Sequence, residues 1–448
     1  MHFVQVVHSV PSQPPLASAT AARVPRANPT AGFTFAIAIF ALAILFCHSR
    51  ALPADWPQIL GPNRDGQATA TTPLATQWPA NLKPVWTADI GNGYGGAAIV
   101  GNSVYVMHRI GGEEFLESLD SATGKRNWRT PWKATYRTSI DPDNGPRCVP
   151  TIVANKAICY GAAGDLACIQ TTDGKLLWSR PLRKEYSAED GYFGAGASPL
   201  VIDDLIIVNI GGPKAGIVGL DLATGKTRWT ATTQDASYAA PIQLKQVGKS
   251  GKPLALVITR LKTVLLDSAD GSVLSEVNFG SRGPTVNAAT PIEVAPNQFL
   301  LTASYGIGST LLSTANAKLT EVYRGNQLLS SQYNTPVFIK DRIIGIDGRE
   351  DAGASTLRAF DPLKQKTIWE QSGFSTSHLI AVGNQVLVIS VDGTIQIIDG
   401  TASSYTALAK SDLPSGTYRA LPALSNKLIV LRKTTGPSAS QCIAIKLP

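Results

Sequence analysis

Short apolar runs separated by Asp, Gly and Pro follow one another along most of the chain. Residues 198–232 show the pattern clearly, because the runs SPLVID, DLIIVNI, GIVGLDL and KTRWTAT either alternate apolar with polar residues or are largely apolar. Val, Ile and Leu are frequent in these runs, and turn residues bound each one, as is typical of β-strands. No helical periodicity of useful length interrupts them, so the pattern predicts an all-β protein.

One corner between two such strands is repeated. In LDLATGKTRW (220–229), Asp221 and Trp229 stand eight residues apart, and the same frame fits six further places, at 120–128, 170–178, 267–275, 313–321, 361–369 and 399–407. A Pro that opens an apolar strand recurs in phase, at positions 150, 199, 241, 291, 336 and 422. Two markers with one period of about 48 residues and four strands per period predict the blades of a β-propeller.

The corner residues have structural roles in this interpretation. The Asp accepts hydrogen bonds from turn amides, the Gly supplies a positive φ angle, and the Trp covers apolar area between neighbouring blades. The sequence therefore assigns a structural repeat to Asp120, Asp221, Asp267 and Asp361, and to Trp86, Trp128, Trp178, Trp229 and Trp369.

The repeat also predicts how the ring closes. Seven corners are followed by an incomplete unit of three strands at 418–448, whereas residues 82–91 form a lone strand before the first complete unit. Joining the two makes an eighth blade whose outer strand comes from the N-terminal side, which leaves no open edge. We therefore expect a monomeric, eight-bladed β-propeller of four-stranded antiparallel blades over residues 82–448, and we expect deletion of residues 82–91 to unfold it.

The first 51 residues are typical of an export signal. They contain three Arg but no Lys, Asp or Glu, and they run into an apolar stretch at 31–47. Either the segment is cleaved after Ala51 or residues 31–47 stay in the inner membrane as an anchor, and both place the remainder in the periplasm or cell envelope. Residues 52–81 are expected to be an extended segment, in which GPNRDG (61–66) either pins the chain to the ring by a tight turn or offers Arg64 and Asp65 to a partner.

Charge and cysteine content narrow the function classes. The formal net charge of +8 falls to +5 without the three arginines of residues 1–51, and the remaining excess of positive charge is scattered along the chain, so nucleic acid is excluded as a partner.

Cys159 and Cys168 flank the turn GAAGD almost symmetrically, so they form either a disulfide or two buried free thiols. Without a CxxC pair or a His cluster, a zinc site is not expected.

The Asp-x-x-Thr/Asp-Gly-Lys-x-x-Trp corner with a Pro-led inner strand resembles the repeat of the pyrroloquinoline-quinone-like (PQQ-like) propellers, over about residues 82–448. Eight-bladed members include quinoprotein dehydrogenases and the BamB-like proteins of outer-membrane assembly. The resemblance implies that a dehydrogenase would hold its cofactor between a Trp and a disulfide of adjacent cysteines, beside calcium and a catalytic Asp. This chain has no Cys-Cys pair, and its tryptophans are nearly all assigned to the repeat or to the segment before it. We therefore expect no cofactor and no metal.

Candidate binding residues lie where the inner strands begin, because that position borders the central channel of a propeller. The alternative is that they are solvated loop residues without a partner. No GxSxG occurs, and GNGYGG (91–96) is followed by a strand instead of the helix that a dinucleotide site needs. We expect a non-catalytic scaffold that binds an envelope protein or polymer; the alternatives are a divergent PQQ-dependent oxidoreductase and a carbohydrate-binding or carbohydrate-cleaving propeller. The predicted channel rim consists of Arg147, Tyr238, Asn287, Tyr333, His378 and Arg419.

Overall fold

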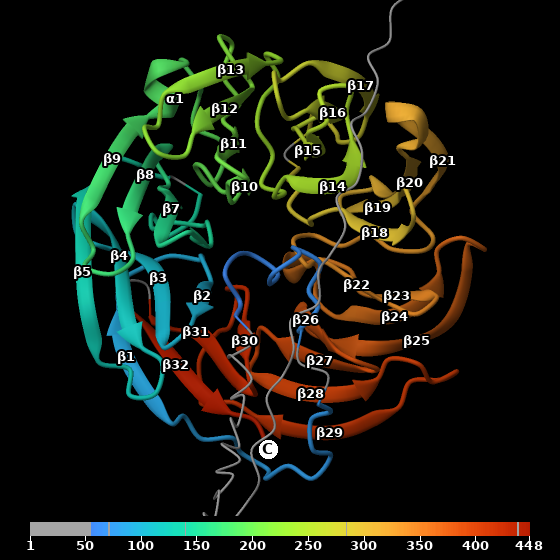
Figure 1. Ribbon diagram of the computed structural model, residues 1–448. Coiled ribbons are helices and arrows are strands. Elements are labelled where there is room, and N and C mark those ends of the chain that lie inside the picture. Colours follow the sequence, from blue (N-terminus) through green and yellow to red (C-terminus); the bar gives the residue numbers. More distant parts are fainter. Residues whose placement is uncertain (1–54, 70–71, 139, 284, 437–438) are drawn as a thin grey trace, which may run out of the picture. The chain divides into compact units, whose positions relative to one another are not determined.

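A computed structural model describes residues 55–69, 72–138, 140–283, 285–436 and 439–448, and in these residues the strands form eight four-stranded antiparallel sheets. The sheets surround one axis, and the first strand of each lies nearest the centre (Figure 1). The first four blades are β2 (Ala97–Val100), β3 (Ser103–Ile110), β4 (Glu113–Asp120) and β5 (Arg126–Lys133); β6 (Thr151–Val153), β7 (Lys156–Tyr160), β8 (Asp165–Gln170) and β9 (Leu176–Pro181); β10 (Leu200–Ile202), β11 (Leu205–Asn209), β12 (Ile217–Asp221) and β13 (Thr227–Ala231); and β14 (Ile242–Val247), β15 (Pro253–Ile258), β16 (Lys262–Asp267) and β17 (Val273–Asn278).

The remaining blades continue the same order. They are β18 (Ile292–Ala295), β19 (Gln298–Ala303), β20 (Gly308–Ser313) and β21 (Thr320–Gly325); β22 (Val337–Ile339), β23 (Arg342–Asp347), β24 (Ser355–Asp361) and β25 (Lys366–Phe374); β26 (Ser377–Val382), β27 (Gln385–Ser390), β28 (Thr394–Asp399) and β29 (Ala407–Asp412); and β30 (Ala423–Ser425), β31 (Leu428–Gly436), β32 (Ala439–Lys446) and β1 (Trp86–Ile90). In the described residues, the connections also contain three short helices, α1 (Leu182–Glu185), η1 (Ala315–Ala317) and η2 (Glu350–Ala352).

The burial of the strands explains the apolar runs of the sequence. In blade 3, every residue of β11 is buried, whereas exposed and buried residues alternate in the second half of β13. Middle strands are covered on both faces by the neighbouring blades, so they are apolar throughout, and outer strands face water along part of their surface. The predicted all-β, eight-bladed architecture is confirmed.

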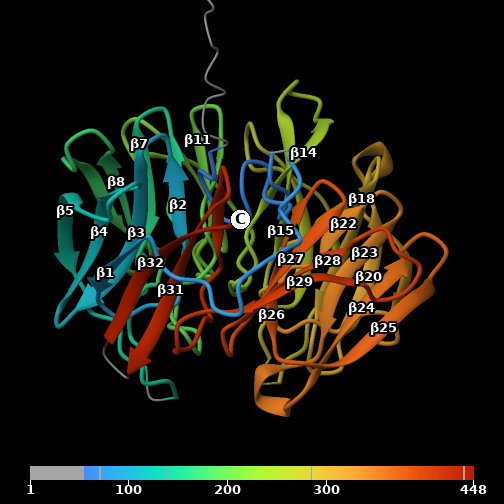
Figure 2. The ribbon, with the colours of Figure 1, turned by 90° about the horizontal axis from the view of Figure 1, so that it is seen from below.

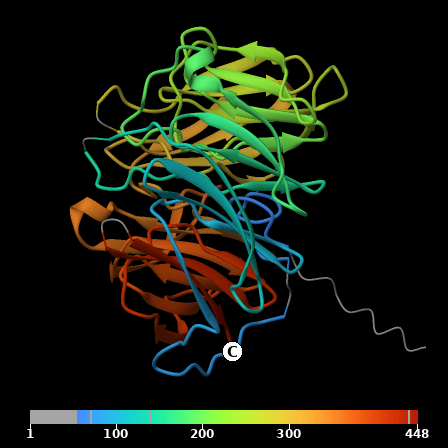
Figure 3. The ribbon, with the colours of Figure 1, turned by 90° about the vertical axis from the view of Figure 1, so that its left-hand side faces the viewer.

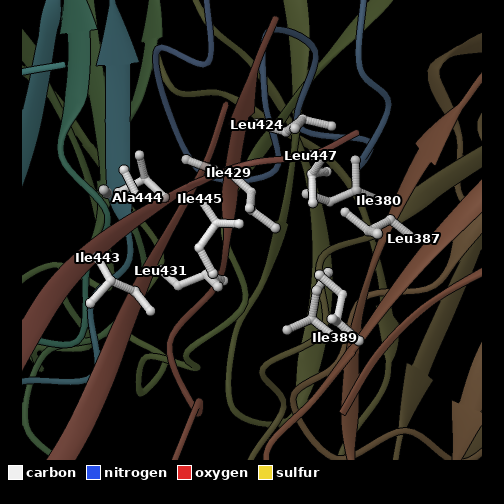
Figure 4. Close-up of a cluster of buried hydrophobic side chains, with 14 of the residues drawn as sticks. Ile380, Leu387, Ile389, Leu424, Ile429, Leu431, Ile443, Ala444, Ile445 and Leu447 are labelled. Carbon is white, nitrogen blue, oxygen red and sulfur yellow. The ribbon is translucent and has the colours of Figure 1, made fainter. Parts of the chain in front are cut away.

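The predicted closure of the ring is confirmed as well. β1 pairs antiparallel with β32, from Trp86 opposite Ala444 to Ile90 opposite Ser440, so the fourth strand of blade 8 comes from the other end of the propeller sequence. The pairing of β1 with β32 can be followed in Figure 2. Apolar side chains of blade 8, including Leu431 and Ile443, pack in one cluster with Leu387 and Ile389 of blade 7, so the closing blade shares its core with its neighbour (Figure 4).

In four blades the repeated corner has a glycine that lies under the Trp of the preceding blade. In blade 3, Asp221 Oδ1 accepts hydrogen bonds from the backbone N–H and the hydroxyl of Thr224, at 2.8 and 2.7 Å. Gly225 has a φ angle of +68°, and a Cβ atom added there would lie 2.7 Å from the indole of Trp178 in blade 2. The indole N–H of Trp178 also donates to the carbonyl of Leu222. Glycine is therefore required at this position for two reasons: the turn needs a positive φ angle, and the indole of Trp178 leaves no room for a Cβ atom.

The same arrangement recurs at three more blade junctions, and two of the exceptions follow the same logic. Where blade 4 has Ser275 in the Trp position, the corner of blade 5 has Ala317 at positive φ, and where blade 5 has Glu321, the corner of blade 6 has Gln365. Without an indole above it, the corner residue can carry a side chain. The junctions with an indole over a glycine, besides that of Trp178, are Trp86 on Gly124, Trp128 on Gly174 and Trp229 on Gly271.

The sequence alternative of a disulfide between Cys159 and Cys168 is wrong. Cys159 lies opposite Ala167, and Cys168 lies opposite Ile158, so the two cysteines are one step out of register across β7 and β8. Successive side chains of a strand point to opposite faces, and the two thiols accordingly belong to different apolar clusters. Both are fully buried and free, which is the other alternative that the sequence left open.

The segment before β1 also packs on the propeller. Residues 72–85 pass along blades 7 and 8, where the N–H of Leu82 donates to the carbonyl of Asp412 and that of Ala75 to the carbonyl of Pro448 (Figure 3). The expected export segment, residues 1–51 with the apolar stretch 31–47, lies outside the described residues. No helix within the described part of the chain has the length and apolar character needed to cross a bilayer.

Candidate functional site at the channel mouth

The described N-terminal residues 55–68 cross the centre of the ring, where they form a plug (dark blue in Figure 1). The plug bonds to the inner strands of blades 1, 2 and 7 through backbone groups. The N–H groups of Ile99, Ile152 and Ala381 donate to the carbonyls of Trp56, Pro57 and Gly66, at 2.8–2.9 Å. The chain therefore closes its own channel with main-chain hydrogen bonds.

Arg64 anchors the plug to blades 2, 3 and 4. Its side chain donates to the carbonyls of Pro241, at 2.9 Å, and Ser198, at 3.2 Å, to the carbonyl of Pro199, and to the hydroxyl of Thr151. Burial lowers the pKa of Arg64 to about 9, which leaves the guanidinium charged at neutral pH. The hydrogen bonds of Arg64 are therefore all made within the protein. This agrees with the prediction that GPNRDG pins the chain to the ring, and it disagrees with the alternative that Arg64 contacts a partner.

A cavity of about 440 Å³ lies at the channel mouth, and we call it the bowl. Ile59 of the plug, Phe193, Val286, Ala288 and Leu421 give it apolar lining. Five of the six residues of the predicted rim line it together. The complete polar and aromatic lining is Tyr94, Asp141, Arg147, Tyr238, Gln332, Tyr333, Glu350, Asp351, His378 and Arg419.

The prediction is wrong for Asn287. This side chain is buried, and its amide nitrogen lies 3.0 Å from the carbonyl oxygen of Arg260, to which it donates a hydrogen bond. The neighbours Val286 and Ala288 line the bowl instead. Asn287 fastens a blade-4 loop because an amide at this position satisfies carbonyls that the turn would otherwise leave unpaired.

A hydrogen-bonded chain crosses the rim between blades far apart in sequence. The guanidinium of Arg419 pairs with Glu350 at 2.6 Å, and the hydroxyl of Tyr333 donates to the same carboxylate at 2.8 Å. Arg419 also donates to the hydroxyl of Tyr94 at 3.3 Å, and that hydroxyl donates to Asp141 at 3.0 Å. Burial and the charge of Asp141 raise the pKa of Tyr94 to about 12, so this phenol stays protonated. The rim is held as one network.

Arg147 is fixed between two aromatic rings. The carbon of its guanidinium lies 5.2 Å from the ring centre of Tyr94 and 5.6 Å from that of Tyr136. The same guanidinium donates to the carbonyls of Asp143 and Gly145. Cation–π contacts and backbone hydrogen bonds both restrict its rotamers, so the positive charge has a defined place on the rim.

His378 is buried in the wall of the bowl as a neutral imidazole. Its Nε2 lies 2.8 Å from the carbonyl of Arg419, so Nε2 carries the proton and donates it. Burial lowers the pKa of His378 to about 4, and Nδ1 has no hydrogen-bond partner. The wall therefore contains an unused acceptor.

Sequence reasoning missed Tyr94, Asp141 and Glu350. Tyr94 stands three residues before the inner strand β2. Four of the predicted rim residues stand four residues before their own inner strands, so the repeat frame could have located Tyr94 as well; these four are Arg147, Tyr238, Tyr333 and Arg419. Glu350 comes from η2, an insertion between β23 and β24, and Asp141 comes from the long connection before β6. These connections follow no repeat frame, and only the folded chain brings them to the rim.

Glu114 of β4 is a buried carboxyl outside the lining of the bowl, and we expect it to make the stability of the fold depend on pH. Its oxygens accept hydrogen bonds from the Ala162 N–H and the Trp132 indole, both at 3.1 Å, but burial raises the pKa of Glu114 from 4.5 to about 7. The folded protein thus binds a proton that the unfolded chain has released between these two values. Stability from this group is present below pH 4.5 and is lost as the pH rises through 7, by about 3 kcal/mol.

Glu114→Gln tests this expectation. The difference in unfolding free energy between wild type and variant, measured by urea denaturation from pH 4.5 to 8, should shift in favour of the variant by about 3 kcal/mol as pH rises. Taking the difference cancels the other titrating groups. A constant difference across this range would contradict the raised pKa.

The model of the family described as outer membrane protein assembly factor BamB matches residues 112–371, more than half of the chain. The chain belongs to this family. A BamB of Burkholderia pseudomallei is 27% identical over 178 residues, which are 39% of either chain, so the match spans about two fifths of the length of that relative.

Solved structures agree on the fold. BamB from Moraxella catarrhalis matches with a TM-score of 0.57 at 15% identity, covering 81% of this chain and 99% of that one. A europium-containing methanol dehydrogenase matches with a TM-score of 0.63 at 11% identity, covering 88% of this chain and 98% of that one. A quinohemoprotein alcohol dehydrogenase from Pseudomonas putida matches with a TM-score of 0.61 at 13% identity, covering 88% of this chain and 80% of that one. At such identities the likeness shows the shared propeller alone.

The bowl lacks the Trp and the adjacent cysteines between which, by the resemblance, a quinone cofactor would be held. Neither a Trp nor a Cys is among the residues that line it. Trp86, Trp128, Trp178, Trp229 and Trp369 all lie in the fourth strand of a blade, where they hold the blade corners. Within the described residues, no group of three His, Cys, Asp or Glu side chains is placed to hold a metal ion.

Proposed function

We propose that this protein is a non-catalytic scaffold of the cell envelope and that the bowl binds a loop of a partner protein. The observation that carries the proposal is an apolar cavity inside a pre-organised ring of Tyr and Arg side chains. Tyr and Arg dominate the residues that contribute most to protein–protein affinity, above all around a pocket that an apolar anchor can fill. Membership of a family described as an outer-membrane assembly factor supports a partner in the envelope.

The rigidity of the rim supports binding rather than a solvated loop surface. Arg147 is held by two rings, and Arg419, Tyr333 and Tyr94 share one hydrogen-bonded chain. Because these side chains are ordered before a partner arrives, association costs less conformational entropy. The alternative of a quinone-dependent oxidoreductase is supported by the fold alone. If the protein turned over alcohols or sugars with added quinone and calcium, that alternative would be correct and our proposal wrong.

Site-specific photocrosslinking in intact cells tests the proposal. A photoreactive residue in place of Asp351, on the bowl, should yield an adduct with an envelope protein, whereas the same residue in place of the exposed corner residue Asp173 should not. Arg419→Ala should lower the adduct yield about tenfold, as expected for a central interface residue. Arg228→Ala is the matched control, because Arg228 pairs with Asp204 and Asp221 away from the bowl. Equal yields in both variants would contradict the proposal.

A further inference from the structure

A second cavity, of about 400 Å³, adjoins the bowl, and we call it the side pocket. The two share Tyr238 and Gly196 as a common wall. The side pocket is built where the strands of blades 2 and 3 end: Tyr160 is the last residue of β7, Asn209 is the last residue of β11, and α1 adds Arg183. Tyr160, Asn209 and Arg183 were not predicted from the sequence, whereas Tyr238 was predicted as a rim residue, and the scaffold function leaves this pocket without a role.

Two neutral polar groups in the pocket wall have no protein partner. The hydroxyl of Tyr160 is unpaired in a side chain that is 1% exposed, and Oδ1 of Asn209 is unpaired in a residue that is 2% exposed. The Nδ2 of Asn209 donates to the carbonyl of Ile258 at 2.9 Å, which identifies the other amide atom as the oxygen. Buried polar groups are nearly always hydrogen-bonded in folded proteins, so an unpaired donor and an unpaired acceptor in one cavity wall indicate a polar ligand.

The charges of the two arginines that the argument concerns are balanced or held by the protein. Arg183 Nη1 lies 3.0 Å from Asp190 Oδ1, which balances its charge, although Nε and Nη1 of Arg183 have no hydrogen-bond partner. Arg260 donates to the carbonyls of Gly283, at 2.7 Å, and Thr285, at 3.3 Å, and its guanidinium lies 5.4 Å from the ring centre of Tyr192. The unpaired groups of the wall are the phenol of Tyr160, the amide oxygen of Asn209, and Nε and Nη1 of Arg183. A ligand with several hydroxyls complements all of them, because a hydroxyl accepts and donates hydrogen bonds.

The walls between these polar groups are aromatic. Tyr136, Tyr192 and Tyr238 line the pocket, and two of them are fixed: the hydroxyl of Tyr136 donates to the carbonyl of Tyr192 at 3.1 Å, and that of Tyr238 accepts from the N–H of Phe193 at 2.9 Å. Aromatic faces pack on apolar C–H surfaces, whereas the unpaired groups take hydroxyls. From this combination we infer that the side pocket binds one uncharged, hydroxyl-rich sugar unit of a glycan.

Disaccharide binding to the full protein tests the inference. Maltose, cellobiose and diacetylchitobiose are titrated and followed by saturation-transfer NMR and calorimetry, and at least one is expected to bind. Tyr160→Phe removes only the unpaired hydroxyl, so it should weaken that binding about tenfold while the melting temperature stays equal or rises. Tyr323→Phe is the matched control, because Tyr323 also has a buried, unpaired hydroxyl and does not line the pocket.

Three results would overturn the inference: no binding of any of the three sugars, equal affinities for the Tyr160→Phe and Tyr323→Phe variants, or binding restricted to a sugar phosphate or uronic acid used as a charged probe. The result of the sugar-binding experiment does not depend on whether the scaffold proposal is correct. Crosslinking through position 351 depends on the bowl, so it should persist in Tyr160→Phe, and it can fail while sugar binding persists.

Discussion

A chain that lacks residues 1–91 is expected to lose the cooperative unfolding transition, whereas a chain that lacks residues 1–81 should keep one at a lower temperature. The two truncations differ by β1, which pairs with β32 over five residue pairs. Backbone hydrogen bonds contribute about 1 kcal/mol each, and burial of a large side chain such as that of Trp86 contributes about 3 kcal/mol. Their sum is comparable to the whole stability of an ordinary domain, about 5–15 kcal/mol.

The loss of β1 acts on two blades at once. In blade 8 it exposes the edge of β32, and in blade 1 it uncovers Gly124, which the indole of Trp86 covers in the intact ring. Both truncations remove the plug, so its contribution cancels in the comparison. Calorimetry and circular dichroism of the two chains supply the measurement, and identical melting curves would mean that β1 does not close the ring.

The sequence was informative where one local rule repeats. Asp221, Gly225 and Trp229 recur because every blade needs the same turn and the same cover, so period, strand count and closure could all be read from spacing. Positions counted back from each inner strand located Arg147 and Arg419 for the same reason. A repeat predicts what each unit shares with the others.

The sequence was uninformative where one residue acts between units. Arg64 bonds to three blades from a segment outside the repeat, and Glu350 enters the rim from an insertion in a single blade. Cys159 and Cys168 looked symmetric about their turn, but a register shift of one residue reverses the face to which a side chain points. Spacing along the chain does not determine such contacts, because they depend on the register and on the three-dimensional path of the loops.

Arg64→Ala is expected to be the most destabilising single substitution of the plug, by about 4 kcal/mol. It leaves the carbonyls of Ser198 and Pro241 without their donor, whereas the carbonyl of Pro199 still accepts a hydrogen bond from the hydroxyl of Thr151. Each buried acceptor left unpaired costs about 1–3 kcal/mol, and removing the buried charge offsets part of that cost. Arg228→Ala, which also removes a hydrogen-bonded arginine but from the surface, should cost less than 1 kcal/mol.

Equilibrium urea unfolding of the two variants measures this difference, and amide hydrogen exchange identifies its place. The N–H groups of Ile99, Ile152 and Ala381 donate to carbonyls of the plug, so release of the plug should speed their exchange in Arg64→Ala and leave it unchanged in Arg228→Ala. Exchange in the outer strands serves as the internal reference. If both variants lose equal stability, or if these three amides stay protected in Arg64→Ala, the plug is held by its backbone bonds and Arg64 is not its anchor.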